Sequence, residues 1–214
     1  MAGLATSQVQ QLLDSQLAVL STTQVQAIET EDVAAMTDAQ LPLLTLNQIK
    51  SLTTSQIGAI TTAQVQVLDP TQVGAMSLAQ VEALSSEDFK LLNIDQLQYL
   101  TTGVVSNLST DRIQQLTTDQ VAMLSQKQVK VLTTTQIIAV TTDQIGNLNA
   151  DQLTVITSTQ LRAIELQDVP FLTGVQFDAL GYSKVNSLTS DQKAAVTTSQ
   201  IAAITDESIQ GIFI

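Results

Sequence analysis

The sequence contains no cysteine and no histidine. The absence of cysteine excludes disulfides and thiolate nucleophiles, and the absence of both residue types excludes Cys/His metal sites and the commonest general base. No other catalytic constellation is visible. We therefore expect that the chain is not an enzyme, that it has no catalytic, cofactor-binding or metal-binding residues, and that it needs no cofactor.

Aromatic residues make up only 3% of the chain, so any core must consist of Leu, Ile, Val and Ala. Basic residues are also few, and the formal net charge of −12 argues against nucleic-acid and anionic-membrane partners. No apolar run approaches the roughly 20 residues that a membrane-spanning helix needs, which predicts no membrane insertion. Residues 1–11 have no basic segment followed by an apolar one, so we expect no secretory signal peptide there.

The sequence does contain a repeat of eight residues. When Thr141 is taken as position 1 of a repeat, the sequence divides into 26 octads without insertion or deletion. Their consensus is T-x-x-Q-[IVL]-x-x-[LI]. Position 8 is apolar in all 26 octads, position 5 in 25, and position 4 is Gln in 19. We therefore predict one uninterrupted array over residues 5–212, with residues 1–4 and 213–214 as flanking ends.

Each octad carries the signals of a helix start. Thr at position 1 as N-cap and Gln at position 4 as N3 form a capping box, and apolar residues at the preceding position 8 and at position 5 form a hydrophobic staple. Of the 20 acidic residues, 18 lie in positions 1–4, and five of the eight basic residues lie in positions 5–8. This polarity matches a helix dipole. Pro70 falls at N1, where proline is favoured.

The alternatives fit less well. One continuous helix would rotate its apolar stripe by about 80° per octad, and Pro42 and Pro170 at position 6 also favour short helices. A β-solenoid remains as the alternative, but positions 5 and 8 would face opposite sides of a strand. We predict an all-α solenoid of one- to two-turn helices, one per octad, that share a thin continuous core.

Position 4 is Glu in no octad, although a capping box accepts Glu. We hypothesise that successive Gln side chains stack in a partly buried, hydrogen-bonded ladder, in which Glu would bring like charges together. On this hypothesis single Gln→Glu changes are mild, and several together are costly.

Several features are candidates for binding, each with a structural interpretation that we favour. Acidic residues at position 3, such as Asp143 and Asp151, form a regularly spaced row that could bind metal ions. They are explained more simply by the preference for acidic side chains at exposed helix starts. Lys193 at a core position either marks a pocket or extends its ammonium to solvent. Paired threonines offer a regular hydroxyl array or serve as caps and first-turn residues. These pairs are Thr53–Thr54, Thr61–Thr62, Thr117–Thr118, Thr141–Thr142 and Thr197–Thr198.

Two stretches depart from the consensus and would be the first places to look for a partner. Residues 101–116 lose the Gln twice, at Val104 and Arg112. Residues 173–196 collect Val175, Gly181, Tyr182, Lys184 and Lys193. Decay of an array produces the same pattern, so no binding residue is assigned.

The phrases LTTSQIGAITTAQVQVL and LTTTQIIAVTTDQIGNL resemble the LTT-x-Q-[IV]-x-x-[LI] tracts of very large bacterial secreted or cell-surface proteins. The resemblance covers essentially the whole chain. It implies an extracellular or cell-surface location, a structural or adhesive setting, and flanking repeats or domains of a longer chain as partners. The ends 1–3 and 213–214 show no polar capping repeat, so we expect a fragment of such a protein.

The sequence thus predicts a non-enzymatic spacer, stalk or scaffold within a larger bacterial surface or secreted protein. The alternative is a binding module for a protein partner or a repetitive polymer, such as a polysaccharide or ice, through a regular Thr/Gln surface.

Overall fold

The structure is a computed structural model, and it describes residues 6–214. The predicted N-terminal flank at residues 1–4 and the first octad residue, Ala5, lie outside the described residues.

Residues 6–214 form short helices without a strand, which confirms the all-α solenoid and rules against the β-solenoid. The chain divides into two compact units, residues 1–108 and 109–214. The first unit contains α1 (Thr6–Val9), α2 (Asp14–Ala18), α3 (Thr22–Gln26), α4 (Thr30–Ala35), η1 (Leu41–Leu43), α5 (Leu46–Ser51), α6 (Thr54–Gly58), α7 (Thr62–Val67), α8 (Pro70–Ala75), α9 (Leu78–Ala83), α10 (Ser86–Lys90), α11 (Ile94–Tyr99) and α12 (Thr102–Val105). The second contains α13 (Thr110–Gln115), α14 (Thr118–Met123), α15 (Gln126–Val131), α16 (Thr134–Ala139), α17 (Thr142–Gly146), α18 (Ala150–Val155), α19 (Ser158–Ala163), η2 (Val169–Phe171), α20 (Gly174–Leu180), α21 (Tyr182–Asn186), α22 (Ser190–Ala195), α23 (Thr198–Ala203) and α24 (Glu207–Gln210).

The unit boundary lies between two octads, within the predicted departure at residues 101–116. The octad register runs through it unchanged, and the single array over 5–212 stays a prediction.

The capping box starts most helices, as the repeat predicts. In α17, Thr141 Oγ1 accepts from Gln144 N at 3.4 Å, and Gln144 Oε1 accepts from Thr141 N at 2.8 Å. The exchange satisfies two amides that a helix start otherwise leaves without a partner. Pro70 stands at N1 of α8, as predicted.

The core consists of the position 5 and position 8 side chains. Every apolar residue at position 5 is buried except Ile201. Every residue at position 8 is buried except Leu12, Leu20 and Ile212, which lie near the two ends of the chain. In the second unit the side chains at positions 5 and 8 enclose a void of only about 20 Å³. Its lining is entirely aliphatic and consists of Ile113, Leu116, Val121, Leu124, Val129, Leu132, Ile137, Val140, Ile145, Leu148 and Ile156. The aliphatic core is therefore closely packed.

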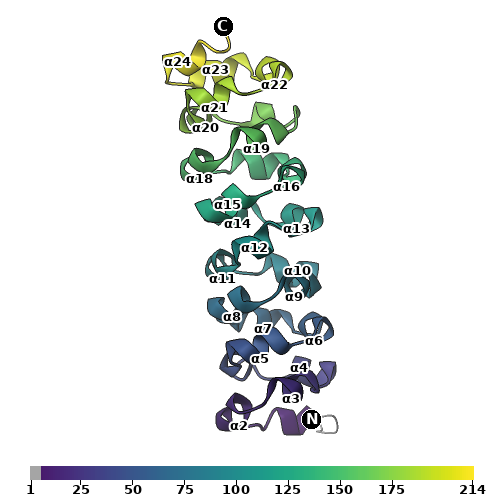
Figure 1. Cartoon of the computed structure of the whole chain (residues 1–214). Coiled ribbons are helices and arrows are strands. Elements are labelled where there is room, and N and C mark those ends of the chain that lie inside the picture. Colours follow the sequence, from purple (N-terminus) through teal and green to yellow (C-terminus); the bar gives the residue numbers. More distant parts are fainter. Residues whose placement is uncertain (1–5) are drawn as a thin grey trace. The chain divides into compact units, whose positions relative to one another are not determined.

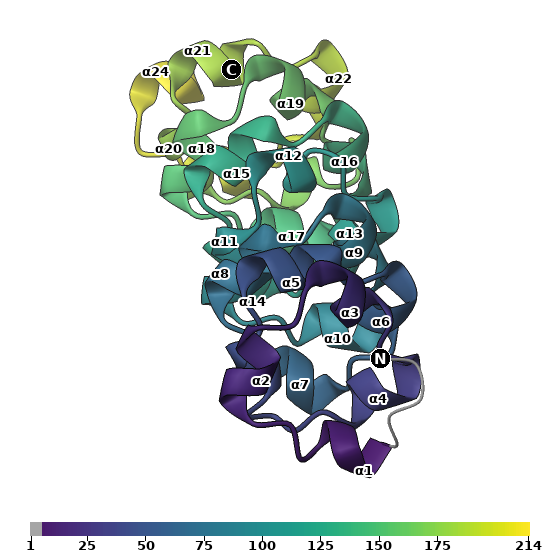
Figure 2. The ribbon, with the colours of Figure 1, turned by 60° about the horizontal axis from the view of Figure 1, so that its bottom comes forward.

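Within each unit, helices three octads apart lie against one another and form three stacks. In the first unit these are α1–α4–α6–α9, α2–η1–α7–α10 and α3–α5–α8–α11. Figure 1 shows α5, α8 and α11 one above another, and Figure 2 shows α7 and α10 of another stack from a second side. In the second unit, α13–α16–α19, α14–α17–η2–α22 and α15–α18–α20–α23 stack in the same way. Each short helix thereby gains the tertiary packing that it needs for stability.

Two octads depart from the predicted α-helix. Pro42 and Pro170 at position 6 lie in the 3₁₀ helices η1 and η2 instead of α-helices. Proline has no N–H to give to a carbonyl four residues earlier, so these octads close with the tighter 3₁₀ turn.

Candidate functional site

The position 4 glutamines connect octads that lie four repeats apart. Gln144 Nε2 lies 2.9 Å from the carbonyl oxygen of Ile113, 3.4 Å from that of Gln114 and 2.6 Å from that of Leu116. These carbonyls belong to the last turn of α13, where a helix leaves its C=O groups without intrahelical donors. One amide therefore caps the start of its own helix through Oε1 and the end of a distant helix through Nε2.

We call this contact the Gln brace. In every example described, Nε2 donates to the carbonyls 31 and 28 residues earlier, at positions 5 and 8 of the earlier octad. Its members are Gln40, Gln48, Gln56, Gln64, Gln72, Gln80, Gln96, Gln144, Gln152, Gln160, Gln176, Gln192 and Gln200. All of them are buried.

The brace corrects the ladder hypothesis. The braced glutamines are buried, as expected, but their Nε2 atoms donate to backbone carbonyls and not to other glutamines. Glu could still accept from the N-cap amide, yet it has no donor for the carbonyls and would place its charge against their oxygens. A missing donor therefore explains the absence of Glu, and we expect even a single replacement to be costly.

Three octads have Asp at position 4, and in two of them the carboxylate accepts a hydrogen bond from a distant threonine. Asp88 Oδ1 accepts from the Thr62 hydroxyl at 2.9 Å, and Asp168 Oδ1 accepts from the Thr142 hydroxyl at 2.7 Å. Both threonines stand 26 residues earlier, in the helix stacked three octads before. The shorter carboxylate thus binds a hydroxyl donor instead of supplying a donor itself. Asp168 also lines a depression of about 260 Å³.

Lys184 takes over the donor role of Gln. Its Nζ lies 3.0 Å from the carbonyl oxygen of Leu153 and 2.6 Å from that of Thr154, which are 31 and 30 residues earlier. Partial burial lowers the pKa of Lys184 because it disfavours the ammonium form. This departure from the consensus therefore has a structural explanation.

The remaining departures in the two stretches differ in burial. Val104 and Arg112 are buried, with Arg112 Nη1 donating to Gln115 Oε1 at 2.8 Å. Lys193 Nζ donates to the exposed Asn186 Oδ1 at 3.2 Å, so its ammonium extends to solvent. Val175 and Tyr182 are exposed, and nothing in the described structure joins them into a site. Gly181 has a φ of 76°, which favours glycine.

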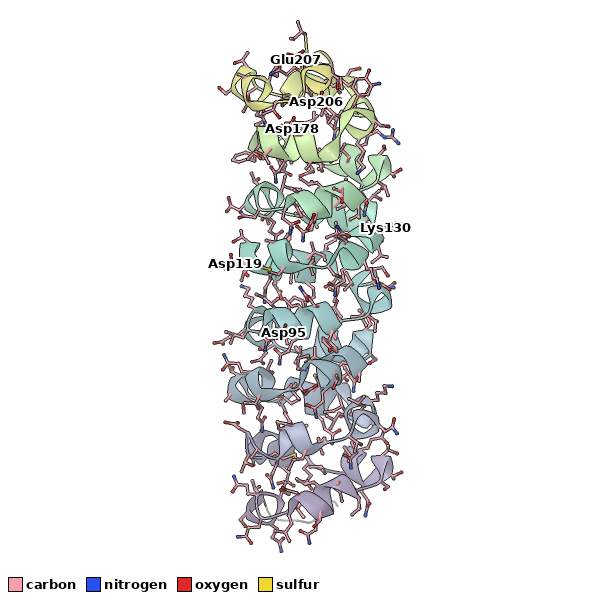
Figure 3. All side chains as sticks on the ribbon, turned by 90° about the vertical axis from the view of Figure 1, so that its left-hand side faces the viewer. Asp95, Asp119, Lys130, Asp178, Asp206 and Glu207 are labelled. Atoms are coloured by element: carbon pink, nitrogen blue, oxygen red, sulfur yellow. The ribbon has the colours of Figure 1, made fainter. Side chains whose placement is uncertain are left out.

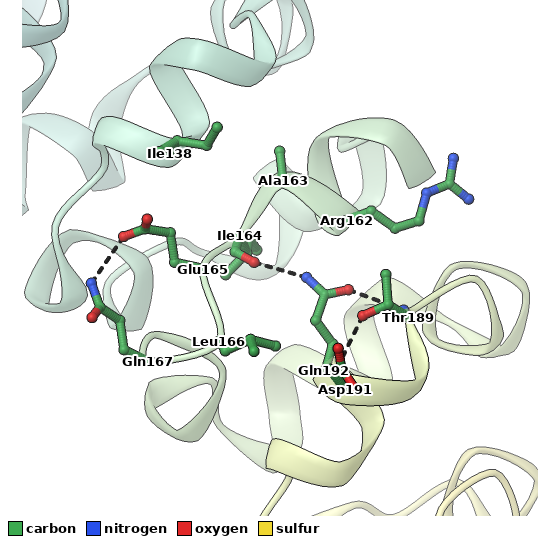
Figure 4. A pocket seen from close by; sticks show the side chains of 10 residues that line it. All are labelled: Ile138, Arg162, Ala163, Ile164, Glu165, Leu166, Gln167, Thr189, Asp191 and Gln192. Atoms are coloured by element: carbon green, nitrogen blue, oxygen red, sulfur yellow. Dashed lines mark hydrogen bonds between the residues drawn. The ribbon is translucent and has the colours of Figure 1, made fainter.

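An open depression of about 650 Å³ lies in the second unit, beside the turn that precedes η2 (Figure 4). Its lining residues are Ile138, Arg162, Ala163, Ile164, Glu165, Leu166, Gln167, Thr189, Asp191 and Gln192. Glu165 stands at position 1, where most octads have Thr, Ser, Asp or Asn, and its Oε2 accepts from Gln167 Nε2 at 2.9 Å. Ile138 and Leu166 are each 49% exposed. The guanidinium of Arg162 extends away from Glu165 in Figure 4.

The candidate metal and hydroxyl arrays appear as ordinary helix starts. Asp143 and Asp151 are exposed first-turn residues, as are Asp95 and Asp119 (Figure 3). Within residues 6–214, no group of three or more acidic side chains gathers as a metal site. In each pair, the hydroxyl of the first Thr accepts a hydrogen bond from the backbone amide of the Gln three residues later. The first Thr therefore acts as the N-cap.

The last octad has contacts of its own, which the sequence did not suggest. Asp178 accepts from the hydroxyl of Thr205 at 2.7 Å and from the amides of Thr205 and Asp206, at the start of α24 (Figure 3). Burial acts to raise the pKa of Asp178, but these hydrogen bonds together hold it below its ordinary value. Phe213 packs edge-on against Phe177, with ring centroids 5.8 Å apart.

Comparison with known proteins identifies the repeat type. Residues 25–68 and 47–78 match the ALTTAQ repeat family. This confirms the predicted LTT-x-Q octapeptide repeat over residues 25–78. A search of curated proteins found no match to the chain. Among the described residues, no helix has the length and apolar character needed to span a bilayer.

Proposed function

We propose that the chain is a non-enzymatic structural repeat module that acts as a spacer, stalk or scaffold in a larger bacterial surface or secreted protein. The Gln brace carries this proposal. The most regularly repeated polar side chain is buried and uses both of its amide atoms to hold backbone. The resemblance to bacterial surface tracts supports the location and supports flanking repeats or domains as partners.

The alternative is a binding module for a protein or a polysaccharide. The depression beside Glu165 favours it, because two half-exposed aliphatic side chains lie there beside carboxylates. The regular Thr/Gln surface predicted for such a module is not present as expected. The braced glutamines are buried, and of these two repeated positions only the capping threonines face solvent.

Distances between spin labels test the spacer. The chain has no cysteine, so labels can be placed by Thr23→Cys with Thr102→Cys in the first unit and by Lys127→Cys with Ser199→Cys in the second. A spacer requires one narrow distance distribution in each unit. Adding Gln64→Glu, which removes a brace donor to Val33 and Met36, should broaden the first distribution. Adding Gln66→Glu, an exposed neighbour, should leave it narrow. Broad distributions in the unaltered units would contradict the proposal.

Capture of surface polysaccharides and host proteins tests the alternative. Binding that is lost with Leu166→Asp and retained with Ile94→Asp, at a similarly exposed site in the first unit, would favour the binding module.

A further inference from the structure

Position 7 of the repeat differs between the two units. In the stack α2–η1–α7–α10 of the first unit, Leu43, Val67 and Leu91 occupy this position and are 37–39% exposed. The same series, with a step of three octads, continues in the sequence to Ala139 and Ala163 of the stack α13–α16–α19, where both side chains are half-buried. We call the three side chains of the first unit the aliphatic ridge.

The fold does not require large side chains at this position. Helix α7 ends in Val67, α16 in Ala139 and α19 in Ala163, and all three are six-residue helices with a complete capping box. An apolar side chain that stays exposed contributes little burial to its own unit. A row of such side chains on the surface is typical of an interaction site.

The second unit is hollowed where its position 7 residues are small. The depression of about 260 Å³ has Ala139 in its lining, and the depression of about 650 Å³ has Ala163 (Figure 4). The two depressions share Ile138, Glu165 and Gln167, so they adjoin. We call them together the alanine groove.

The ridge and the groove have the same spacing along their stacks. Stacked helices lie about 8–10 Å apart, so neighbouring ridge side chains and the two groove alanines recur at that interval. The larger depression lies at Ala163 and the smaller at Ala139, and the ridge offers the larger Leu91 and the smaller Val67. Because Leu91 and Ala163 are nine octads apart in the sequence, as are Val67 and Ala139, one alignment of two copies seats both side chains.

The charges near the two surfaces are complementary. Carboxylates of Glu165 and Asp191 line the larger depression, and the guanidinium of Arg162 extends away from Glu165 (Figure 4). On the ridge, Lys90 directly precedes Leu91. A ridge seated with Leu91 in this depression brings the ammonium of Lys90 toward these carboxylates, which opposes the repulsion between two chains of net charge −12.

We propose that the aliphatic ridge of one copy of this chain binds the alanine groove of a second copy, side by side and parallel, with Leu91 at Ala163 and Val67 at Ala139. The half-exposed aliphatic side chains of the groove lose water in the same contact. The contact covers two or three layers of helices, less than a standard interface of about 1,600 Å², so we expect a Kd of about 10–100 µM. It uses a different surface on each copy, so one copy can bind two others.

Sedimentation equilibrium of the whole chain over a concentration series tests the proposal, because mass should grow with concentration through the expected Kd. The ridge variant carries Leu43→Ala, Val67→Ala and Leu91→Ala, and the groove variant carries Ala139→Leu and Ala163→Leu. The repeat already has Ala and Leu at position 7, so both variants should keep the helicity of the unaltered chain in circular dichroism. Each variant alone should associate at least roughly tenfold more weakly.

A mixture of the two variants is the decisive sample. The ridge variant keeps its groove and the groove variant keeps its ridge, so the mixture should associate although neither variant does so alone. Tyr99→Ala with Met123→Ala is the control, since it removes exposed apolar side chains at position 7 of other stacks. It should associate like the unaltered chain.

Disulfide trapping tests the alignment. Leu91→Cys in one sample and Ala163→Cys in another should form mixed disulfides on mixing, in preference to disulfides within either sample. Leu43→Cys in place of Leu91→Cys should trap much less, because its alignment would differ by two layers.

Several results would overturn the proposal. A chain that stays monomeric up to about 1 mM has no such contact. Folded ridge or groove variants that associate as strongly as the unaltered chain, or a mixture that does not associate, would exclude the pairing of ridge with groove. Loss of association in the control, or equal trapping from Leu43→Cys and Leu91→Cys, would show an unspecific apolar contact.

Discussion

At the scale of the residue, Gln at position 4 is selected because one side chain must accept and donate at once. Gln144→Glu keeps the acceptor for Thr141 N and loses the donor to Ile113 and Leu116. We expect it to lower the free energy of unfolding by about 2–4 kcal/mol, since it takes the donor from the buried Leu116 carbonyl, leaves Ile113 O with only the Leu116 amide, and buries a charge.

Gln24→Glu is the matched control for this change. It adds the same charge and keeps the same kind of cap, but Gln24 is exposed and has no brace to lose. It should cost no more than about 0.5 kcal/mol. Chemical denaturation of the two variants measures both values, and equal costs would show that the brace contributes nothing.

Asp178 should make helix α24 sensitive to acid. Its pKa is lowered in the folded chain, so the folded state binds fewer protons than the unfolded state around the ordinary Asp pKa. The stability that it contributes is therefore present above that ordinary value, and it is lost as the pH falls through the lowered one. Amide hydrogen exchange of residues 205–210, corrected for intrinsic rates, should show less protection at pH 3 than at pH 5.

Asp178→Asn should reduce this protection at both pH values and remove most of the difference between them. A smaller pH dependence should remain because hydrogen bonds from Ser208 also lower the pKa of Asp206. An unchanged pH dependence in the variant would assign the effect to Asp206 or another carboxylate.

At the scale of the element, caps and core should contribute equally wherever the repeat is intact. Ile145 and Ile57 are each 1% exposed, and Thr141 and Thr53 each cap their helix. We expect Ile→Ala at either position to cost about 2–4 kcal/mol and Thr→Ala about 1 kcal/mol. Denaturation of the four variants measures this. Ile changes that cost no more than Thr changes would mean that position 5 is not the core.

Close approach between stacked helices should make Gly174 irreplaceable. A Cβ on Gly174, at the start of α20, would clash with the backbone and side chain of Ala203 in α23. Gly174→Ala should therefore lower the unfolding midpoint. Gly103→Ala in α12 is the control, because its Cβ would meet only Thr101 Oγ1 at 3.8 Å. It should be neutral or stabilising through the unfolded chain. Similar midpoints for the two variants would contradict the clash.

The elements were predictable because their signals are local. The Thr141–Gln144 capping box and the buried Ile145 follow from spacings of three and four residues within one helix. The brace from Gln144 to Ile113 was not predictable, because it depends on which octads the superhelix brings together. The contacts of Asp178 with the start of α24 also depend on packing that no local pattern records.

At the scale of the whole molecule, the octad is a unit of register as well as a unit of structure. Contacts between stacked helices span three octads, and braces span four. After removal of a whole octad, each later residue still packs against a residue at the same repeat position as before. After removal of half an octad, core residues at position 5 would instead stand where exposed position 1 residues stood. Stability in such arrays is approximately a sum over repeats and their interfaces.

Deletion of residues 141–148 should therefore preserve the fold. Thr134 would then stand 26 residues before Asp168, where Thr142 now donates, so even this special contact has a replacement. Deletion of residues 141–144 alone moves every later Gln and core residue out of register with the preceding octads. Circular dichroism and thermal unfolding should show nearly full helicity and a modest loss of stability for the first deletion. The second should show a large loss of helicity or of cooperative unfolding in the second unit. If the two deletions behaved alike, the eight-residue register would not be what holds the stacked helices together.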